Sequence, residues 1–239
     1  MHRPRPSLLV PLVVSLPILA ALACSNAPEQ PILNHFFTAS RLRDKSSLDS
    51  FATAVFEPRT DGTVQTFSIT SVTPEQRTPL TLKSLQQVFD AADAEDTAFN
   101  QRKVAYQDAN LDAIKRVLAA EDQKSELKGK DLEVQAEWAK FREEGMAVHK
   151  KLTEARDNLA AATRVVELSV QTPGTPVDVS NRDGDLVSKD VTISARVRQP
   201  DGQTVQKTLV VTMQKAELKG DNVPADVRWV ITAVKAQPS

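Results

Sequence analysis

Residues 131–166 read DLEVQAEWAKFREEGMAVHKKLTEARDNLAAATRVV, and their periodicity is the strongest structural signal in the sequence. Its apolar residues recur at alternating spacings of three and four, the heptad pattern of a helix that packs against another helix along one seam. The seam positions are Val134, Trp138, Phe141, Gly145, Val148, Leu152, Ala155, Leu159, Ala162 and Val166. A continuous seam of this length predicts a partner helix of similar length.

The partner helix is predicted just upstream, because the chain from Thr81 to Val166 has no proline and only two glycines, Gly129 and Gly145. Polar residues at some seam places either set the register or loosen the packing. We expect a turn near 124–130 and an antiparallel coiled-coil hairpin over 81–165, with arms of about 50 to 60 Å. The seam of the first arm contains Leu82, Leu85, Phe89, Ala92, Asp96, Phe99, Lys103, Tyr106, Asn110, Ala113 and Val117.

The segments that flank the hairpin favour β-structure. TVQTFSITSV at 63–72 is rich in β-branched residues, and VVELSVQT from Val166 reads as the start of a second β region. Further strands alternate around a turn at Pro200–Gly202 and end in VRWVITAVK. Their expected inward side chains are Val191, Ile193, Ala195, Val197, Leu209, Val211, Met213, Trp229 and Ile231.

A sheet with one apolar face needs a cover, and two N-terminal helices are the natural candidates. The first is predicted in PILNHFFTASRLRD from Pro31, and the second in LDSFATAVF at 48–56. The predicted fold class is therefore α+β, an antiparallel sheet covered by N-terminal helices with a long coiled-coil hairpin inserted. The body comprises 31–80 and 166–239, and the hairpin comprises 81–165.

The first 23 residues have the three parts of a secretory signal. Arg3 and Arg5 form a basic start, an apolar stretch runs from Leu8 to Leu22, and small residues follow. About 15 apolar residues are too few to cross a bilayer as a helix, and two prolines interrupt them. We expect this signal peptide, 1–23, to be removed.

The residues AALAC at 20–24 resemble a lipobox, the site at which bacterial lipoproteins are acylated on cysteine. Ala21 occupies the place where leucine is commonest, and Leu22 follows it. The resemblance implies acyl chains on Cys24, cleavage before it, a polar tether at 24–30 and membrane attachment through lipid. Ser25 favours the outer membrane over the inner. The alternative is an ordinary signal cleaved after Ala23, which leaves Cys24, the only cysteine, as a free thiol.

The composition excludes some classes of function. The chain has 30 basic and 31 acidic residues, so it lacks the positive footprint of a nucleic-acid-binding protein. Aromatic residues make up only 5%, fewer than an aromatic-lined ligand cleft requires. We find no nucleophile elbow, phosphate-binding loop or zinc motif, and the histidines have no metal-ligand spacing. We therefore expect no metal and no cofactor.

Two segments resemble the α+β superfamily of nuclear-transport-factor-2-like (NTF2-like) proteins. HFFTASRLRDKSSLDSFATAVF at 35–56 is similar to the opening pair of helices, and DVRWVITAVK at 226–235 is similar to the last strand. Enzymes of that superfamily place a histidine and an aspartate inside a cone for acid–base chemistry, which implies a pocket at His35 and Asp44. The alternative is that His35 has only a packing role at the edge of the core. We expect His149 to lie at a solvent-exposed position on a helix.

The hairpin gives the leading functional hypothesis, a non-enzymatic envelope lipoprotein that faces the periplasm and contacts another envelope protein. A small-molecule-binding or enzymatic cone is the second hypothesis; a body filled by Phe36, Phe51, Phe67 and Trp229 counts against it. A third follows from a resemblance to the periplasmic adaptors of efflux pumps, in which a helical hairpin separates two halves of a small domain. PRTDGTVQTFSI at 58–69 carries that resemblance.

Overall fold

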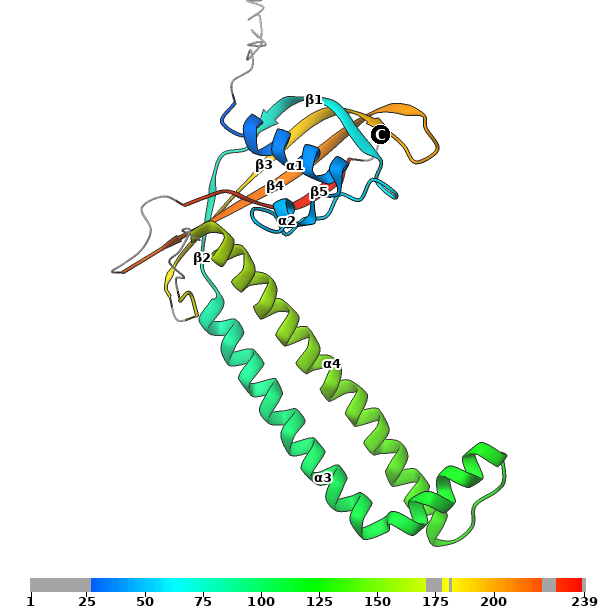
Figure 1. Ribbon diagram of the computed structural model, residues 1–239. Helices are drawn as coiled ribbons and strands as arrows, with labels where there is room; N and C mark the ends of the chain where they lie inside the picture. Colours follow the sequence, from blue (N-terminus) through cyan, green and yellow to red (C-terminus); the bar gives the residue numbers. More distant parts are fainter. Residues whose placement is uncertain (1–26, 171–177, 181, 221–226, 238–239) are drawn as a thin grey trace, which may run out of the picture.

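The computed structural model describes residues 27–170, 178–180, 182–220 and 227–237. They form an α+β body and a long helical hairpin that projects from it (Figure 1). The body contains one open antiparallel sheet of five strands and two short helices. This architecture confirms the predicted fold class.

The sheet has the strand order β1-β3-β4-β5. Strand β1 pairs with the C-terminal half of β3, and β2 pairs with its N-terminal part. The β3–β4 ladder runs without a shift from the Gly184–Leu218 pair to the Arg198–Thr204 pair. Gly202, with φ 88°, supplies the left-handed conformation of the predicted turn between these strands. The strands are β1 (Thr63–Val72), β2 (Gln76–Pro79), β3 (Gly184–Arg198), β4 (Thr204–Leu218) and β5 (Val230–Ala236).

Helices α1 (Gln30–Leu42) and α2 (Lys45–Leu48) lie over one face of the sheet (Figure 1). Alternation along β3 and β4 points every second side chain toward these helices, and α1 contributes Leu33 and Phe36 to the core. Most strand residues predicted to face inward are buried, with exposures of 1% or less for Val191, Ile193, Ala195, Val197, Leu209, Val211, Met213 and Ile231. Trp229 is the exception, because it is half-buried and precedes β5.

The predicted second helix over 48–56 is wrong, because the helix ends at Leu48. The backbone that follows pairs with β5: the Ile231 amide donates to the Phe51 carbonyl at 3.1 Å, and the Thr53 amide donates to the Ile231 carbonyl at 2.9 Å. Val55 is 77% exposed instead of lying on a helical apolar face. Pairing with the edge of the sheet therefore overrides the local helical pattern.

The hairpin consists of α3 (Leu82–Gln123) and α4 (Lys130–Val170), so the turn lies where the sequence predicts it. The predicted β region from Val166 is wrong in its first residues, because α4 continues to Val170. Val166 and Val170 are buried with Leu82 in a cluster that also contains Ala216 and Leu218 of β4. Burial between hairpin and sheet outweighs the strand preference of these β-branched residues.

Helix α3 bends at Asn110, one of the polar seam residues. Asn110 has φ −126° and ψ 20°, and its side-chain amide donates to the Tyr106 carbonyl at 3.0 Å. A side chain that inserts into the helical hydrogen-bond ladder is a recognised cause of a kink. Beyond the bend, the end of α3 crosses the beginning of α4 (Figure 1).

Candidate functional site

The predicted lipidation site, Cys24, and the predicted signal, 1–23, lie outside the described residues. The described chain begins at Ala27, only three residues after Cys24. Three extended residues span at most about 10 Å. A lipid on Cys24 would therefore hold the body next to the membrane surface.

An ion pair attaches the start of the described chain to the sheet. Glu29 and Lys189 form a salt bridge with side chains only 5% and 8% exposed. The Lys189 ammonium also lies 4.1 Å from the centroid of the Trp229 ring, over which Lys215 lies at 4.8 Å. The predicted tether therefore ends earlier than expected, because Glu29 belongs to the folded body. We call Glu29, Lys189 and Trp229 the N-terminal clamp.

Sequence reasoning missed the N-terminal clamp, although β3 contained a signal for it. Lys189 occupies an inward position between Val187 and Val191, which are both fully buried. A charged residue within an apolar alternation predicts a buried partner, because an unpaired buried charge is costly. Nothing in the local pattern of the predicted tether identified Glu29 as that partner, since the two residues are 160 positions apart.

The structure brings His35 and Asp44 together through Ser47, on the surface where α1 meets α2. The Ser47 amide donates to Asp44 Oδ1 at 3.0 Å, which caps α2, and His35 Nε2 lies 2.7 Å from Ser47 Oγ. The His35 ring also packs edge-on against Phe51, with centroids 4.6 Å apart. Both predicted pocket residues are exposed. Their observed contacts stabilise the helix junction.

Aromatic side chains fill the interior of the body. Phe36 is fully buried, and Phe51, Phe67 and Trp229 pack against the same core cluster. The ring centroids of Phe37 and Phe67 are 5.5 Å apart. Of the four residues whose presence counts against a hollow cone, Phe36 thus belongs to the core, and the other three are partly buried against it.

The base of the hairpin is fixed to the body by hydrogen bonds and one ion pair. The buried Ser169 accepts a bond from the Ala216 amide at its hydroxyl, at 3.1 Å, and one from the Arg228 amide at its carbonyl, at 2.8 Å. Lys83 at the start of α3 forms a 2.9 Å ion pair with Asp183. Contacts on both helices therefore fix the direction of the hairpin.

An apolar groove of about 740 Å³ lies where the hairpin leaves the body. Its walls come from the start of α3, the end of α4 and the sheet, and include Leu82, Val165, Leu186 and Thr232. Arg164 of α4 donates to the Asp49 carbonyl at the end of α2 and lies at the rim of this groove. The Arg164 contact adds a further link between the hairpin and the N-terminal helices, which the sequence did not indicate.

Seam residues and ion pairs join the two arms of the hairpin. All the predicted seam positions are buried or half-buried, including Asp96 and Lys103. Phe141 lies in the middle of an aromatic group, with ring centroids 5.0 Å from Tyr106, 6.1 Å from Phe99 and 6.4 Å from Trp138. These rings pack against one another in the seam.

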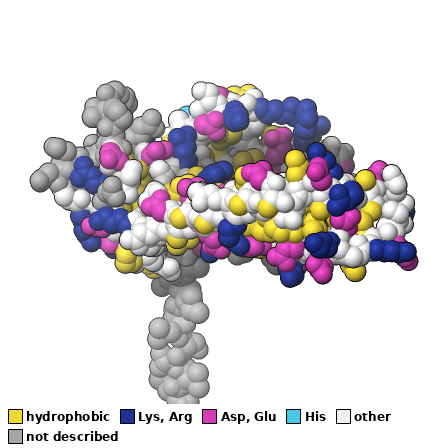
Figure 2. Space-filling view, turned by 90° about the horizontal axis from the view of Figure 1, so that it is seen from below, with side chains coloured by type: hydrophobic (Ala, Val, Ile, Leu, Met, Phe, Trp, Pro, Cys, Tyr) yellow, Lys and Arg dark blue, Asp and Glu magenta, His cyan; other side chains and the backbone are white. Residues whose placement is uncertain are grey.

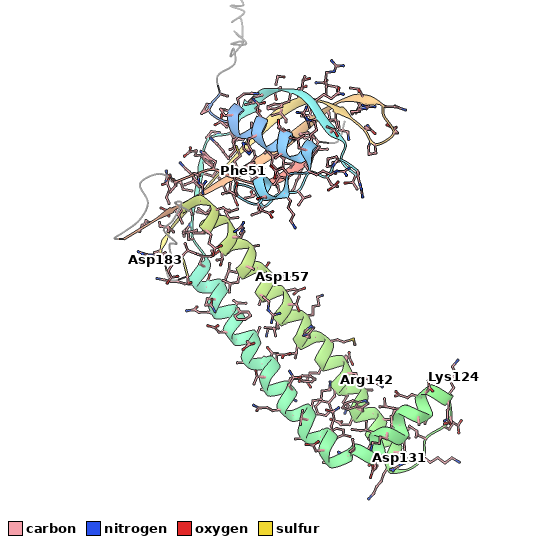
Figure 3. All side chains as sticks on the ribbon, in the orientation of Figure 1. Phe51, Lys124, Asp131, Arg142, Asp157 and Asp183 are labelled. Carbon is pink, nitrogen blue, oxygen red and sulfur yellow. The ribbon has the colours of Figure 1, made fainter. Side chains whose placement is uncertain are left out.

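The distal end of the hairpin is held by two arginine–carboxylate pairs. Arg116 donates two hydrogen bonds to Asp131, at 2.7 and 2.8 Å, and Arg142 donates two to Glu121, at the same distances. Figure 3 shows Asp131 and Arg142 near the loop that contains Lys124. The arginine hydrogen bonds lower the pKa of both Asp131 and Glu121 below their ordinary values. These pairs fix the angle at which the end of α3 crosses α4.

Within the described residues, no group of three or more histidine, cysteine, aspartate or glutamate side chains is placed to hold a metal ion. His149 lies exposed on α4. Among the helices of the described chain, none combines the length and the apolar character needed to span a membrane. No protein-family model, curated protein or solved structure matches this chain.

Proposed function

We propose that this protein is a non-enzymatic lipoprotein of the cell envelope, anchored through Cys24 and facing the periplasm. In this proposal the α3–α4 hairpin contacts another envelope protein. The observation that carries it is the position of the hairpin relative to the start of the folded chain. In Figure 1 the chain enters α1 at the top of the body, and the hairpin extends downward from the opposite side.

The length of the hairpin supports a role in reaching a partner. At 1.5 Å per residue, the 41 residues of α4 extend about 60 Å. The main core of the body consists of residues from α1, the segment after it and the sheet, without any from the hairpin. The body therefore does not need the distal hairpin for its own core. This supports a role for the hairpin in binding another protein.

The N-terminal clamp supports the anchored orientation. It holds Glu29 against the sheet, five residues after Cys24, so only a few residues would separate the lipid from the body. Ser25 favours the outer membrane as the site of attachment. In that orientation the hairpin points away from the membrane surface, toward proteins of the periplasm or of the opposite membrane.

Two alternatives remain from the sequence. The small-molecule or enzymatic cone is disfavoured, because Phe36 lies in the core and Phe51, Phe67 and Trp229 pack against it. An adaptor-like component of a transport system is compatible with a hairpin inserted between β2 and β3, which pair within one sheet. The identity of the partner separates this alternative from the leading proposal, since an adaptor binds a transporter.

The proposal is tested by affinity purification from detergent-solubilised membranes. The full chain is compared with a variant that lacks residues 90–155 but keeps Leu82 and Val166 of the base cluster. We expect at least one envelope protein to be recovered with the full chain and lost with the variant. Fluorescence of Trp229 shows whether the body of the variant is folded. Identical sets of recovered proteins from the two folded chains would refute the proposal.

A further inference from the structure

The two sides of the hairpin differ in how their charges are used. On one side, ion pairs cross between the arms, from Glu95 to Lys151 and from Arg102 to Glu144. On the other side, a groove of about 570 Å³ opens between the helices. We call this side the groove face; its lining includes Phe99, Asn100, Lys103, Phe141, Gly145 and Met146.

Gly145 has no side chain at its seam position, so the Phe99 ring of the opposite helix lies close to its backbone. A Cβ atom at Gly145 would lie 2.9 Å from Cζ of Phe99 on the opposite helix. The Phe99 ring occupies this space, and the neighbouring ring of Phe141 lines the same groove. Two aromatic rings therefore form the apolar part of the groove, and amphipathic helices bind in grooves through such apolar contacts.

Exposed apolar side chains flank the groove on both helices. Val104 is 53% exposed and follows Asn100 by four residues, while Met146 is 70% exposed and follows Arg142 by four residues. Residues four apart lie side by side on a helix. Figure 2 shows hydrophobic side chains exposed along the hairpin between charged ones. The groove face thus combines aromatic rings with apolar edges.

Lys103 distinguishes this face chemically. It is half-buried at a seam position, and its ammonium lies 5.7 Å from the centroid of the Trp138 ring. No carboxylate of the described residues forms an ion pair with it. Of the other charged groups of the groove, Arg142 is paired with Glu121, and Asp96 accepts a hydrogen bond from the neutral amide of Asn100. A half-buried cation without a counter-ion favours a carboxylate supplied from outside.

We propose that the groove face binds a helix of another envelope protein, and that this helix carries apolar residues at heptad spacing and a carboxylate opposite Lys103. The inference rests on the proposed function and adds the surface and the chemistry of the partner. Apolar residues of the partner helix cover Phe141 and Met146, and its carboxylate pairs with Lys103.

A second copy of this chain fits the groove face less well. Two copies anchored in the same membrane would present their hairpins in parallel, so that the same residues meet at the same height. Lys103 would then face Lys103 of the other copy. Like charges placed opposite each other across an interface are destabilising, and they exclude wrong partners.

The test places a photo-crosslinking amino acid at Val104 in the full, anchored chain, with Val88 as the matched control. Both are valines of α3 with 53% exposure, but their 16-residue separation puts them about 160° apart around the helix. We expect at least tenfold more crosslinked product from position 104, and the crosslinked peptide should belong to one helix of another protein that contains Asp or Glu.

Substitutions of Lys103 test the charge. We expect Lys103→Met, which keeps an apolar stem, to reduce the crosslinking at position 104 at least tenfold. Lys103→Arg, which keeps the cation, should retain most of it, and circular dichroism verifies that both variants keep the helical hairpin.

Three results would overturn the inference. They are equal crosslinking at 104 and 88, products formed only between two copies of this chain, and full crosslinking in Lys103→Met. Crosslinking to a partner from position 88 alone would refute the groove face but leave the proposed function standing. The absence of products from both positions, together with identical affinity purifications, would refute the proposed function itself.

Discussion

The N-terminal clamp makes a sharp prediction about the stability of the body. Glu29→Gln removes the negative charge that compensates the buried Lys189 ammonium and leaves it with only the Trp229 ring and a neutral amide oxygen. Lys189→Met leaves the Glu29 carboxylate buried and also removes the cation–π contact. The double variant Glu29→Gln/Lys189→Met leaves neither charge unpaired. The three variants should therefore destabilise the body by different amounts.

The exposures of 5% and 8% mean that solvent screens this pair very little. Removing one partner of a buried pair costs about 3 to 5 kcal/mol, because the other charge is left uncompensated. A cation–π contact adds up to about 2 kcal/mol when it is desolvated. We expect Lys189→Met to cost the most, Glu29→Gln to cost less, and the double variant to cost the least, since only the double variant leaves no uncompensated buried charge.

Urea unfolding followed by tryptophan fluorescence measures these differences. The chain has two tryptophans, Trp138 in the hairpin and Trp229 in the body, so Trp138→Phe leaves a single reporter in the body. Cys24→Ser in all samples allows unfolding without detergent. A coupling free energy below about 0.5 kcal/mol between the two substitutions would refute the clamp, because residues in contact couple by more than this.

Two further predictions concern the hairpin and the turn before β1. Arg142 lowers the pKa of Glu121 below 4.5, so the pair stabilises the distal hairpin above that pH, and its contribution is lost as the pH falls through the folded pKa. The stability difference between the wild type and Arg142→Gln, measured by circular dichroism, should therefore shrink on acidification; a difference independent of pH would contradict this. Gly62→Ala should lower the Tm more than Gly202→Ala. Both glycines have φ near 90°, where an alanine is strained by roughly 1 to 2 kcal/mol. Only at Gly62 would a Cβ atom also lie 2.6 Å from a backbone oxygen. Equal decreases in Tm for the two variants would contradict an effect of this clash.

The helical hairpin was predictable because its signal is local and repeated. A seam residue every three or four positions over some 80 residues leaves little freedom of interpretation, and the turn at 124–130 follows from where the pattern breaks. The bend was only partly indicated. Asn110 stood out as a polar seam residue, but its side-chain bond to the Tyr106 carbonyl required coordinates.

Features that depend on distant residues were missed. Val166–Val170 looks like a strand by composition, and only its burial against Leu82 and β4 keeps it helical. The segment after Leu48 has helical spacing, but its backbone pairs with β5. Strand β2, with the sequence QRTP, is fully exposed and has no apolar alternation that indicates a strand.

The candidate site was predicted even less completely. The groove face depends on Gly145 lying opposite Phe99, which single-helix periodicity cannot reveal. Lys103 was recognised as a charged seam residue, but the lack of a carboxylate partner became visible only once both arms were in place. His35 and Asp44 are in fact linked, through Ser47, although at a surface junction of helices.

Metabolic labelling with a fatty-acid analogue tests the proposed lipid anchor, because the proposed membrane location depends on Cys24. We predict that the wild-type protein incorporates the label and fractionates with membranes. Cys24→Ser supplies no thiol for acylation, so it should incorporate none and remain an uncleaved precursor or appear in the soluble fraction. A wild-type protein that takes up no label and is released in soluble form after secretion would contradict the lipid anchor.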